Sequence, residues 1–493
     1  MKVIKFGGTS VANPDSLSLV IDIIKNNDQR QLVIVSALGG ITDLLSTMAK
    51  RASNSKKNHK EFLNIIEQRH KTLIDHFIPV TKQSETISFL KAQINELEEI
   101  LDSLFKLNEL TPKSNSKILS YGEILSSKII FKILKCNGCD IIFKDTREII
   151  FKKTINDREV VDDYLSEKKA ISFLKKNKHR ITLFPGFIAG DDEGNTLTLG
   201  RGGSDLTASL LANYSDANKL EIWSDVSGMF TANPKLVSQA TPIRKLSYQE
   251  AMELSHFGAK VIYPPTLQPL IKKGIPVNIK NTFDSNARGT RIDSKGSKRS
   301  DGQIVKGVSH IENVALVSLE GSGMIGIPGF SKRLFQTLSD KQINIIMITQ
   351  ASSEHSICIG VKLEDADLAK KLIDENFAFE INQQKVGPAK IEKNMTNIAI
   401  VGDKMKEHQG ISGKLFSSLG ANNINIRAIA QGASERNISI LIDKINTQKA
   451  LNTIHESFFE EQIKELNLFV TGVGNVGGKL LEQLFGQQDY LLK

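Results

Sequence analysis

The chain has 493 residues, of which 40% are hydrophobic and 24% charged, and its formal net charge is +9. This composition is typical of a globular protein with more than one domain. No dense basic run carries interleaved aromatic residues, so nucleic-acid binding is not expected. No apolar run approaches the roughly 20 residues of a membrane-spanning helix, and the chain opens with a strand pattern instead of a signal peptide. We therefore expect a cytoplasmic protein.

Cysteine is rare in this chain. Cys136, Cys139 and Cys358 are too few for a disulfide scaffold. One C-x-x-C pair without a partner pair is a poor zinc site, because zinc normally takes four ligands. We expect free thiols and no metal site made of protein ligands alone.

Residues 1–40 alternate between strand and helix patterns. Apolar residues at 3–6 lead into a glycine turn, a 3–4 spacing predicts a helix over 17–24, and the β-branched run at 32–35 predicts a buried strand. This alternation predicts a mostly parallel sheet covered by helices. A polar segment at about 44–115 has apolar residues spaced three or four apart, which predicts a helical insertion. The α/β pattern then returns.

The C-terminal third contains an internal repeat. Twelve residues between Gly321 and Ile357 recur 81 positions later, between Gly402 and Ile438. Each copy has the pattern of strand, glycine turn, amphipathic helix, strand, turn and strand, and a polar linker at 293–302 precedes the first copy. Two copies of a small α+β unit favour a paired sensing module, although a purely structural duplication stays open.

The last residues change character again. A strand pattern at 467–470 is followed by Gly-x-Gly-x-x-Gly at 472–477 and a helical pattern, which is the context of a dinucleotide-binding motif. No second strand follows before Lys493, so the acidic residue that binds the ribose has no place. The segment is interpreted as a truncated dehydrogenase domain that does not bind a nucleotide.

Lys5 stands at the end of the first predicted strand, before the turn Gly7-Gly8 and a helix. Adjacent glycines let backbone N–H groups approach a phosphate closely, and a helix N-terminus adds positive potential. Lys5 could neutralise charge on a transferring phosphoryl group. The Walker pattern is absent, so this is a phosphate loop of another kind, or a plain tight turn beside a surface lysine.

A second glycine-rich loop spans residues 200–205 and also leads into a helix. The guanidinium of Arg201 suits a carboxylate. Asp205 falls at the predicted helix start, where it is either a functional group or a helix cap. Two such loops predict that two anions are brought face to face.

Three further residues could contribute to a site. Asp225 follows the strand pattern at 220–222, a position suited to nucleotide or metal binding. Glu123 is predicted to begin a helix, where it could bind an ammonium group or only complement the helix dipole. Lys260 follows a helix that ends near His256, and it is either a phosphate ligand or a partner of that helix's dipole.

Five motifs together resemble those of aspartate kinases. They are Lys-Phe-Gly-Gly-Thr-Ser at 5–10, Tyr-Gly-Glu at 121–123, Gly-Arg-Gly-Gly-Ser-Asp at 200–205, Trp-Ser-Asp-Val at 223–226 and Phe-Gly-Ala-Lys at 257–260. The repeat resembles tandem ACT regulatory domains, and the C-terminal motif resembles the start of homoserine dehydrogenase. The chain is thus similar to the kinase and ACT portion of bifunctional aspartokinase–homoserine dehydrogenases.

The resemblance implies an amino-acid-kinase three-layer α/β/α sandwich at 1–293, tandem α+β ACT domains at 304–466 and a truncated Rossmann βα stub at 467–493. It implies transfer of the γ-phosphoryl group of ATP, with Mg²⁺, to the β-carboxylate of L-aspartate. The product, 4-phospho-L-aspartate, begins lysine, threonine and methionine biosynthesis. No homoserine dehydrogenase activity is expected.

The resemblance also assigns roles to individual residues. Lys5 and Asp205 would act in catalysis. The residues that bind aspartate would be Ser36, Thr42, Glu123, Arg201, Gly203 and Ser204. The residues that bind the nucleotide would be Lys5, Gly7, Gly8, Ser224, Asp225, Phe230, Lys235 and Lys260. Gln350 and Gln431, in equivalent predicted turns, would bind an amino-acid effector, with threonine favoured over lysine, and pairing of ACT modules implies a homodimer or homotetramer.

Some positions depart from the aspartate kinase pattern. Phe230 stands where the family usually has a tyrosine, Lys235 where it has an arginine, and Tyr263 lies where a Leu-His-Pro-Arg run is usual. Lysine lacks the planar fork of arginine, so nucleotide affinity is affected more than reaction type. Two alternatives therefore stay open: an amino-acid kinase for another acid, such as glutamate or carbamate, and an amino-acid sensor built on an inactive kinase.

Overall fold

The computed structural model describes residues 1–54, 59–155, 158–256, 261–296, 304–350, 355–432, 436–460, 472 and 474–487. The chain divides into two compact units, Met1–Phe458 and Phe459–Lys493. No helix in these described ranges is long and apolar enough to cross a membrane.

An eight-stranded sheet organises the first part of the described chain, in the order β10-β12-β11-β9-β1-β2-β6-β3. Its neighbours pair in parallel except β11 and β12. The strands are β1 Lys2–Phe6, β2 Gln31–Val35, β3 Ile141–Phe143, β6 Ile181–Pro185, β9 Lys219–Ser224, β10 Lys245–Ser247, β11 Val277–Asn281 and β12 Thr290–Asp293. Two hairpins flank this sheet: β4 Lys152–Ile155 with β5 Arg158–Val161, and β7 Ile188–Gly190 with β8 Thr196–Thr198.

Alternate residues of the central strands enter separate cores on the two faces of the sheet, as the period of two of a strand requires. Ile4 and Val33 belong to one core, whereas Val3 and Leu32 belong to the other. Residues of α1 Pro14–Lys25, α2 Ile41–Ala52 and α5 Pro112–Cys136 complete the first core. Residues of α6 Asp163–Lys176, α7 Gly203–Tyr214, α8 Tyr248–His256 and α9 Gln268–Ile271 complete the second. The predicted three-layer α/β/α sandwich is therefore confirmed.

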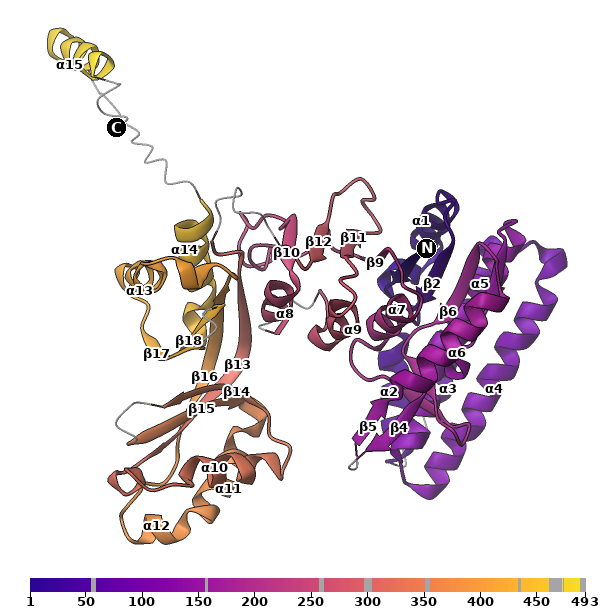
Figure 1. Ribbon diagram of the computed structural model, residues 1–493, viewed down its shortest axis with the longest axis horizontal. Coiled ribbons are helices and arrows are strands. Elements are labelled where there is room, and N and C mark those ends of the chain that lie inside the picture. Colours follow the sequence, from indigo (N-terminus) through magenta and orange to yellow (C-terminus); the bar gives the residue numbers. More distant parts are fainter. Residues whose placement is uncertain are drawn as a thin grey trace. The chain divides into compact units, whose positions relative to one another are not determined.

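The predicted helical insertion consists of two long helices, α3 His59–Phe77 and α4 Ser84–Leu107, which pack with α5 (Figure 1). Their apolar residues, among them Leu63, Ile66, Leu97 and Leu101, continue the core above the sheet. The insertion is therefore anchored to the same sheet face as α1 and α2.

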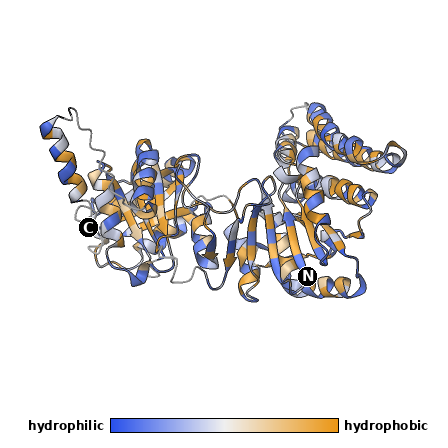
Figure 2. Cartoon of the chain, turned by 90° about the horizontal axis from the view of Figure 1, so that it is seen from above, coloured by the Kyte–Doolittle hydropathy of each residue, from blue (hydrophilic) through white to orange (hydrophobic). Residues whose placement is uncertain are grey.

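A second sheet of six antiparallel strands follows, in the order β14-β15-β13-β16-β18-β17. The strands are β13 Gly307–Glu320, β14 Ile345–Gln350, β15 Ser356–Lys362, β16 Lys390–Val401, β17 Ile426–Gln431 and β18 Asn437–Asp443. The helices are α10 Phe330–Ser339, α11 Ala366–Asn376, α12 Ala378–Asn382, α13 Ile411–Ala421 and α14 Thr447–Phe459. In Figure 2 the strands are largely hydrophobic, whereas the helices carry hydrophilic outer faces.

The repeat corresponds to two interlocked copies within this sheet. The second half of β13 pairs with β15 and the first half of β16, whereas the first half of β13 pairs with the second half of β16, next to β18. The first copy is therefore completed by the first half of β16, a strand that continues into the second copy. The second copy is completed by the first half of β13, a strand that continues into the first copy. The sequence pattern missed a second helix in each copy, α11 and α14.

The predicted C-terminal helix is present as α15 Asn475–Gly486. The strand predicted at 467–470 lies outside the described residues, so the Rossmann stub stays a prediction. The linker predicted at 293–302 begins where β12 ends, at Asp293, and residues 297–302 also lie outside the described residues.

Candidate active site

Three neighbouring strands, β9, β1 and β2, end at the same edge of the parallel sheet. Phe6 is in register with Val35 and with Trp223, so the loops after these strands emerge side by side. In open α/β sheets ligands bind outside the carboxyl ends of the strands. The loop after β1 carries Gly7 and Gly8, the loop after β2 carries Ser36, and the loop after β9 carries Asp225, so the structure places these predicted residues at one edge.

The loops after β1 and β2 contact each other directly. The Gly39 N–H donates to the Gly8 carbonyl at 2.9 Å. A Cβ atom at Gly8 would lie 2.9 Å from the Ala37 carbonyl oxygen, so this approach requires glycine. The Gly7 N–H donates to the Trp223 carbonyl at 3.0 Å and is not available to a phosphate. The N–H groups of Gly8 and Thr9 have no protein acceptor in the described part of the chain.

Lys5 and Asp205 form an ion pair, with Nζ and Oδ1 2.7 Å apart. Both side chains are nearly buried, with exposed fractions of 11% and 13%. Asp205 lies in the first turn of α7, but the helix is capped by Gly202 in the left-handed conformation, with φ 69°, and without a side-chain cap. The capping interpretation of Asp205 is therefore wrong, because its carboxylate faces the lysine at the end of β1.

Glu123 is buried in the middle of α5, so the prediction that it begins a helix is wrong. The helix begins eleven residues earlier, because Thr111 caps it and Pro112 occupies its first position. The neighbouring Gly122 allows the close approach of Ala37, whose Cβ would lie 2.8 Å from an added Cβ. Glu123 therefore enters the site from a helix face that packs on the loop after β2.

Burial raises the pKa of Glu123 to about 8, although an N–H of Ala37 and the charge of Lys5 act in the opposite direction. Its Oε2 atom is buried and has no protein partner among the described residues. A buried carboxylate oxygen without a partner is costly unless the group is neutral or receives a ligand. Glu123 is therefore available to a cationic group.

The remaining residues predicted for aspartate lie in the loops before α2 and α7 or in the first turns of these helices. Ser36 begins the loop after β2, and its carbonyl accepts a hydrogen bond from Ser126 Oγ at 2.7 Å. Thr42 lies in the first turn of α2. Gly203 and Ser204 open α7 and are buried. Arg201 is exposed in the preceding loop, and its guanidinium carbon lies 5.9 Å from the centre of the Tyr263 ring.

Four of the residues predicted for the nucleotide, Ser224, Asp225, Phe230 and Lys235, line one cavity of about 710 Å³. The Ser224 hydroxyl is buried and has no protein partner among the described residues. Residues 308–313 of β13 form another wall of this cavity. Lys260 lies outside the described residues, and α8 spans Tyr248–His256 in the part of the chain before it.

The predicted effector residues, Gln350 and Gln431, occupy equivalent positions at the ends of β14 and β17, and not in turns. They pair with Ile357 and Ile438, which are also 81 residues apart. Gln350 lines a cavity of about 300 Å³ with residues 326–331. The first copy therefore presents a cavity of the size of a small molecule beside this glutamine.

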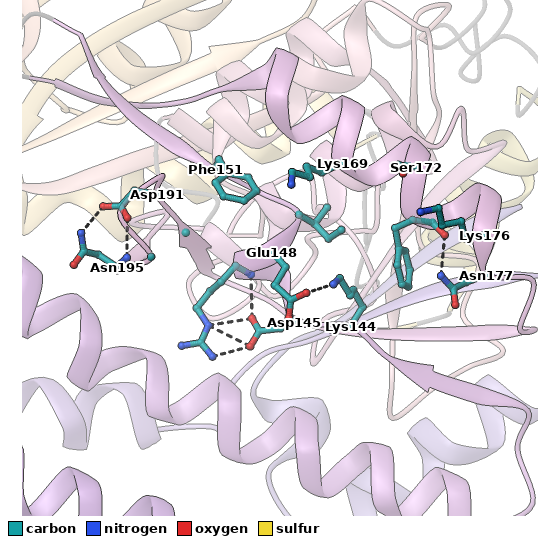
Figure 3. Close-up of a pocket in the computed structure, with 15 residues that line it drawn as sticks. Lys144, Asp145, Glu148, Phe151, Lys169, Ser172, Lys176, Asn177, Asp191 and Asn195 are labelled. Carbon is teal, nitrogen blue, oxygen red and sulfur yellow. Dashed lines mark hydrogen bonds and ion pairs between the residues drawn. The ribbon is translucent and has the colours of Figure 1, made fainter.

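A further cavity of about 650 Å³ contains none of the predicted site residues (Figure 3). Its charged groups largely pair with one another: Arg147 with Asp145, and Lys144 with Glu148. The predicted site residues therefore lie elsewhere in the described part of the chain.

Sequence reasoning missed several residues that shape the site. Arg69 of α3 donates to the Gly39 carbonyl at 2.7 Å, and Thr207 Oγ1 accepts from the Phe187 N–H at 3.0 Å. Lys280 lies over the Trp223 ring, with Nζ 4.7 Å from the ring centre. These contacts involve backbone groups or a ring face, and they leave no spacing pattern in the sequence.

The sequence model described as the Amino acid kinase family matches residues 1–281, more than half of the chain. The chain belongs to the amino acid kinase family. An ACT domain model matches residues 317–377 and 398–458 of the chain. These two ranges are displaced by the 81 residues of the predicted repeat, and the tandem ACT domains are thereby confirmed.

The chain is similar to the bifunctional aspartokinase/homoserine dehydrogenase of Haemophilus influenzae, with 34% identity over 499 residues. The alignment covers 100% of the chain but 60% of that relative. Its structure is similar to a crystal structure of E. coli aspartokinase III in complex with aspartate and ADP, with a TM-score of 0.80, 26% identity and coverage of 93% of this chain and 100% of that chain.

A second crystal structure of E. coli aspartokinase III, in complex with lysine and aspartate, gives a TM-score of 0.74 at 26% identity and the same coverage. The predicted resemblance to the kinase and ACT portion of bifunctional aspartokinases is therefore confirmed. The boundaries predicted for the domains and the roles predicted for individual residues stay predictions.

Proposed function

We propose that this amino acid kinase transfers the γ-phosphoryl group of ATP to the β-carboxylate of L-aspartate, giving 4-phospho-L-aspartate. The observation that carries the proposal is the Lys5–Asp205 ion pair at the junction of two glycine loops, on a sheet edge that also presents the buried carboxyl of Glu123, whose Oε2 has no protein partner among the described residues. The named relative and the neighbour that binds aspartate and ADP support the same substrates.

In this proposal Glu123 binds the ammonium group of aspartate, because its buried Oε2 has no protein partner among the described residues. Arg201 binds the α-carboxylate, while Ser36, Thr42, Gly203 and Ser204 line the pocket. No general base is required, because the side chain of aspartate has a pKa near 3.9 as a model group and is already ionised at neutral pH. Catalysis then consists of positioning and charge stabilisation.

The nucleotide occupies the cavity lined by Ser224, Asp225, Phe230 and Lys235, with Lys260 as a further ligand. The free N–H groups of Gly8 and Thr9 and the Lys5 ammonium face the phosphates in this arrangement. The carboxylates of Asp205 and Asp225 would hold Mg²⁺, which typically takes one or two carboxylates together with phosphate oxygens and waters. When bound, Mg²⁺ neutralises charge on the phosphates.

The reaction can be tested with ATP, Mg²⁺ and each candidate acid in the presence of hydroxylamine, which traps an acyl phosphate as its hydroxamate. We expect product with aspartate and none above background with glutamate or carbamate. Product with another acid alone would identify a different amino-acid kinase. Absence of product with all three, together with effector binding by calorimetry, would favour the sensor built on an inactive kinase, to which Phe230, Lys235 and Tyr263 point.

We also propose feedback inhibition through the ACT domains, with threonine as the favoured effector and lysine as the alternative. The cavity beside Gln350 supports an amino-acid site, and the wall that β13 gives to the nucleotide cavity supports coupling to ATP binding. In the hydroxamate assay, one of threonine, lysine and methionine should inhibit at millimolar or lower concentration. Insensitivity to all three would remove the feedback proposal but not the kinase.

Arg201→Lys is expected to raise the aspartate KM far more than the ATP KM. The planar fork of arginine binds a carboxylate through two hydrogen bonds, which lysine cannot reproduce. Loss of such a partner costs roughly 2–5 kcal/mol in a closed site, and the cost is smaller at an exposed residue such as Arg201. Steady-state kinetics with both substrates decide this point, and the reverse ranking would assign Arg201 to the nucleotide.

Two finer points of the proposal concern assembly and location. We infer a homodimer or homotetramer formed through the ACT sheet, because its edge strands β14 and β17 have no further strand partner in the described residues and carry the exposed side chains of Ile348 and Ile429. Light scattering measures the assembly. A cytoplasmic location is part of the same proposal.

A further inference from the structure

Arg69 lies on α3, outside every motif found in the sequence, and its guanidinium reaches both loops of the active site. Nη1 donates to the Gly39 carbonyl at 2.7 Å, and Nη2 approaches the Ala12 carbonyl at 3.4 Å. The Gly39 N–H in turn donates to the Gly8 carbonyl at 2.9 Å. These hydrogen bonds join the loop after β1, the loop after β2 and the helical insertion into one unit.

The hydrogen bond to Gly39 also sets the direction of neighbouring donors. In a trans peptide the carbonyl and the N–H point in opposite directions. With the Gly39 carbonyl turned toward Arg69, the N–H of Gly40 points away from α3. The N–H groups of Gly40 and Thr42 have no protein acceptor in the described ranges, and both lie at the N-terminus of α2, where partial positive charge accumulates.

We propose that Arg69 is a positioning residue for phosphoryl transfer. It fixes the carbonyl sides of the two loops, and so aims their free N–H groups toward the reacting anions. This inference rests on the proposed kinase function and adds to it a residue from the helical insertion, which then serves the active site as well as the core. Donors aimed at developing charge act through their alignment, and a misplacement of about 1 Å can cost roughly 10²-fold in rate.

The inference is tested with Arg69→Met, which keeps the aliphatic stem and removes every donor, and with Arg69→Lys, which keeps the charge. We expect Arg69→Met to lower kcat by about 10–100-fold, the scale of one charged hydrogen bond, with KM for both substrates within about threefold. Arg69→Lys should recover part of kcat. In Arg69→Ala, guanidinium ion at millimolar concentration should restore part of the lost rate.

The matched control is Arg51→Met. Arg51 belongs to α2, and its guanidinium carbon lies 5.0 Å from the Phe62 ring centre of α3, so it contacts α3 but makes no hydrogen bond to either active-site loop in the described residues. Its kcat should stay at the wild-type value, and both methionine variants should unfold at similar temperatures. A wild-type kcat in Arg69→Met, or a loss that neither lysine nor guanidinium restores, would overturn the positioning role. An inactive wild-type protein would instead refute the proposed function.

Discussion

Lys5→Ala is expected to lower kcat for aspartate phosphorylation by roughly 10²–10³-fold or more, the scale of losing one donor to a developing negative charge. A carboxylate that attacks a triphosphate meets strong charge repulsion, and the Lys5 ammonium lies at the sheet edge where the two anions would meet. The variant also leaves the nearly buried Asp205 carboxylate without its partner 2.7 Å away, which adds negative charge to the site. Single-turnover and steady-state rates with saturating substrates measure the effect.

Lys2→Ala is the matched control for this experiment. Lys2 lies on the same strand and is as buried as Lys5, with 9% of each residue exposed. It also forms an ion pair, since its Nζ lies 3.3 Å from Glu221 Oε2. It stands at the opposite end of β1, away from the loops. Lys2→Ala should therefore lower the free energy of unfolding but leave kcat within a few-fold of wild type. Near-normal turnover in Lys5→Ala would remove Lys5 from catalysis.

The affinity for aspartate is expected to rise with pH up to about pH 8. Burial raises the pKa of the Glu123 carboxyl to about 8 in the free protein, so below that pH the group is mostly protonated. An ammonium group binds the carboxylate form, so aspartate binding must release the proton. The kcat/KM for aspartate should therefore increase about tenfold per pH unit from pH 6 and level off near pH 8, because this ratio reports the free enzyme.

The variant Glu123→Gln distinguishes the titration of the Glu123 carboxyl from that of other groups in the protein. The aspartate KM should rise roughly 30-fold or more, since truncating one partner of a buried charge pair costs about 2 kcal/mol at least, and the dependence on pH should vanish. Without ligand, the raised pKa means that the native state holds this proton more tightly than the unfolded state. Wild-type stability should thus fall, relative to Glu123→Gln, as pH rises from about 4.5 to 8. If the wild-type kcat/KM for aspartate did not change between pH 6 and 8, Glu123 would be excluded as the ammonium ligand.

The sequence predicted the α/β sandwich well because periodicity and β-branching are local signals. Strands β1 and β2 and helix α1 lie where their apolar spacing placed them. The contact between Lys5 and Asp205 is not local, yet both residues stand at the ends of elements that a parallel sheet brings to one edge. The positions of the two motifs were therefore sufficient to predict that both residues lie at the same edge of the sheet. That Lys5 and Asp205 pair with each other could be seen only in the structure.

Other features were missed for identifiable reasons. Glu123 was placed at a helix start because the Thr111-Pro112 cap went unrecognised. The helices α11 and α14 share few identities, although the buried pairs Ala369 and Ala450, and Ile373 and Ile454, do repeat at 81 residues and could have revealed them. Arg69 could not be found at all, because its partners are backbone carbonyls, which every residue type provides.

The strand exchange between the ACT copies constrains the order of events during synthesis. The first copy cannot close its sheet until β16 has left the ribosome, and β13, made early, stays half unpaired until that same strand arrives. The second copy then depends on a strand made more than 100 residues before its last one, β18. Such long separations in sequence between pairing strands slow folding, and they leave an unpaired strand edge that can pair with the wrong strand. A nascent chain stalled between β15 and β16 should therefore be especially prone to chaperone capture.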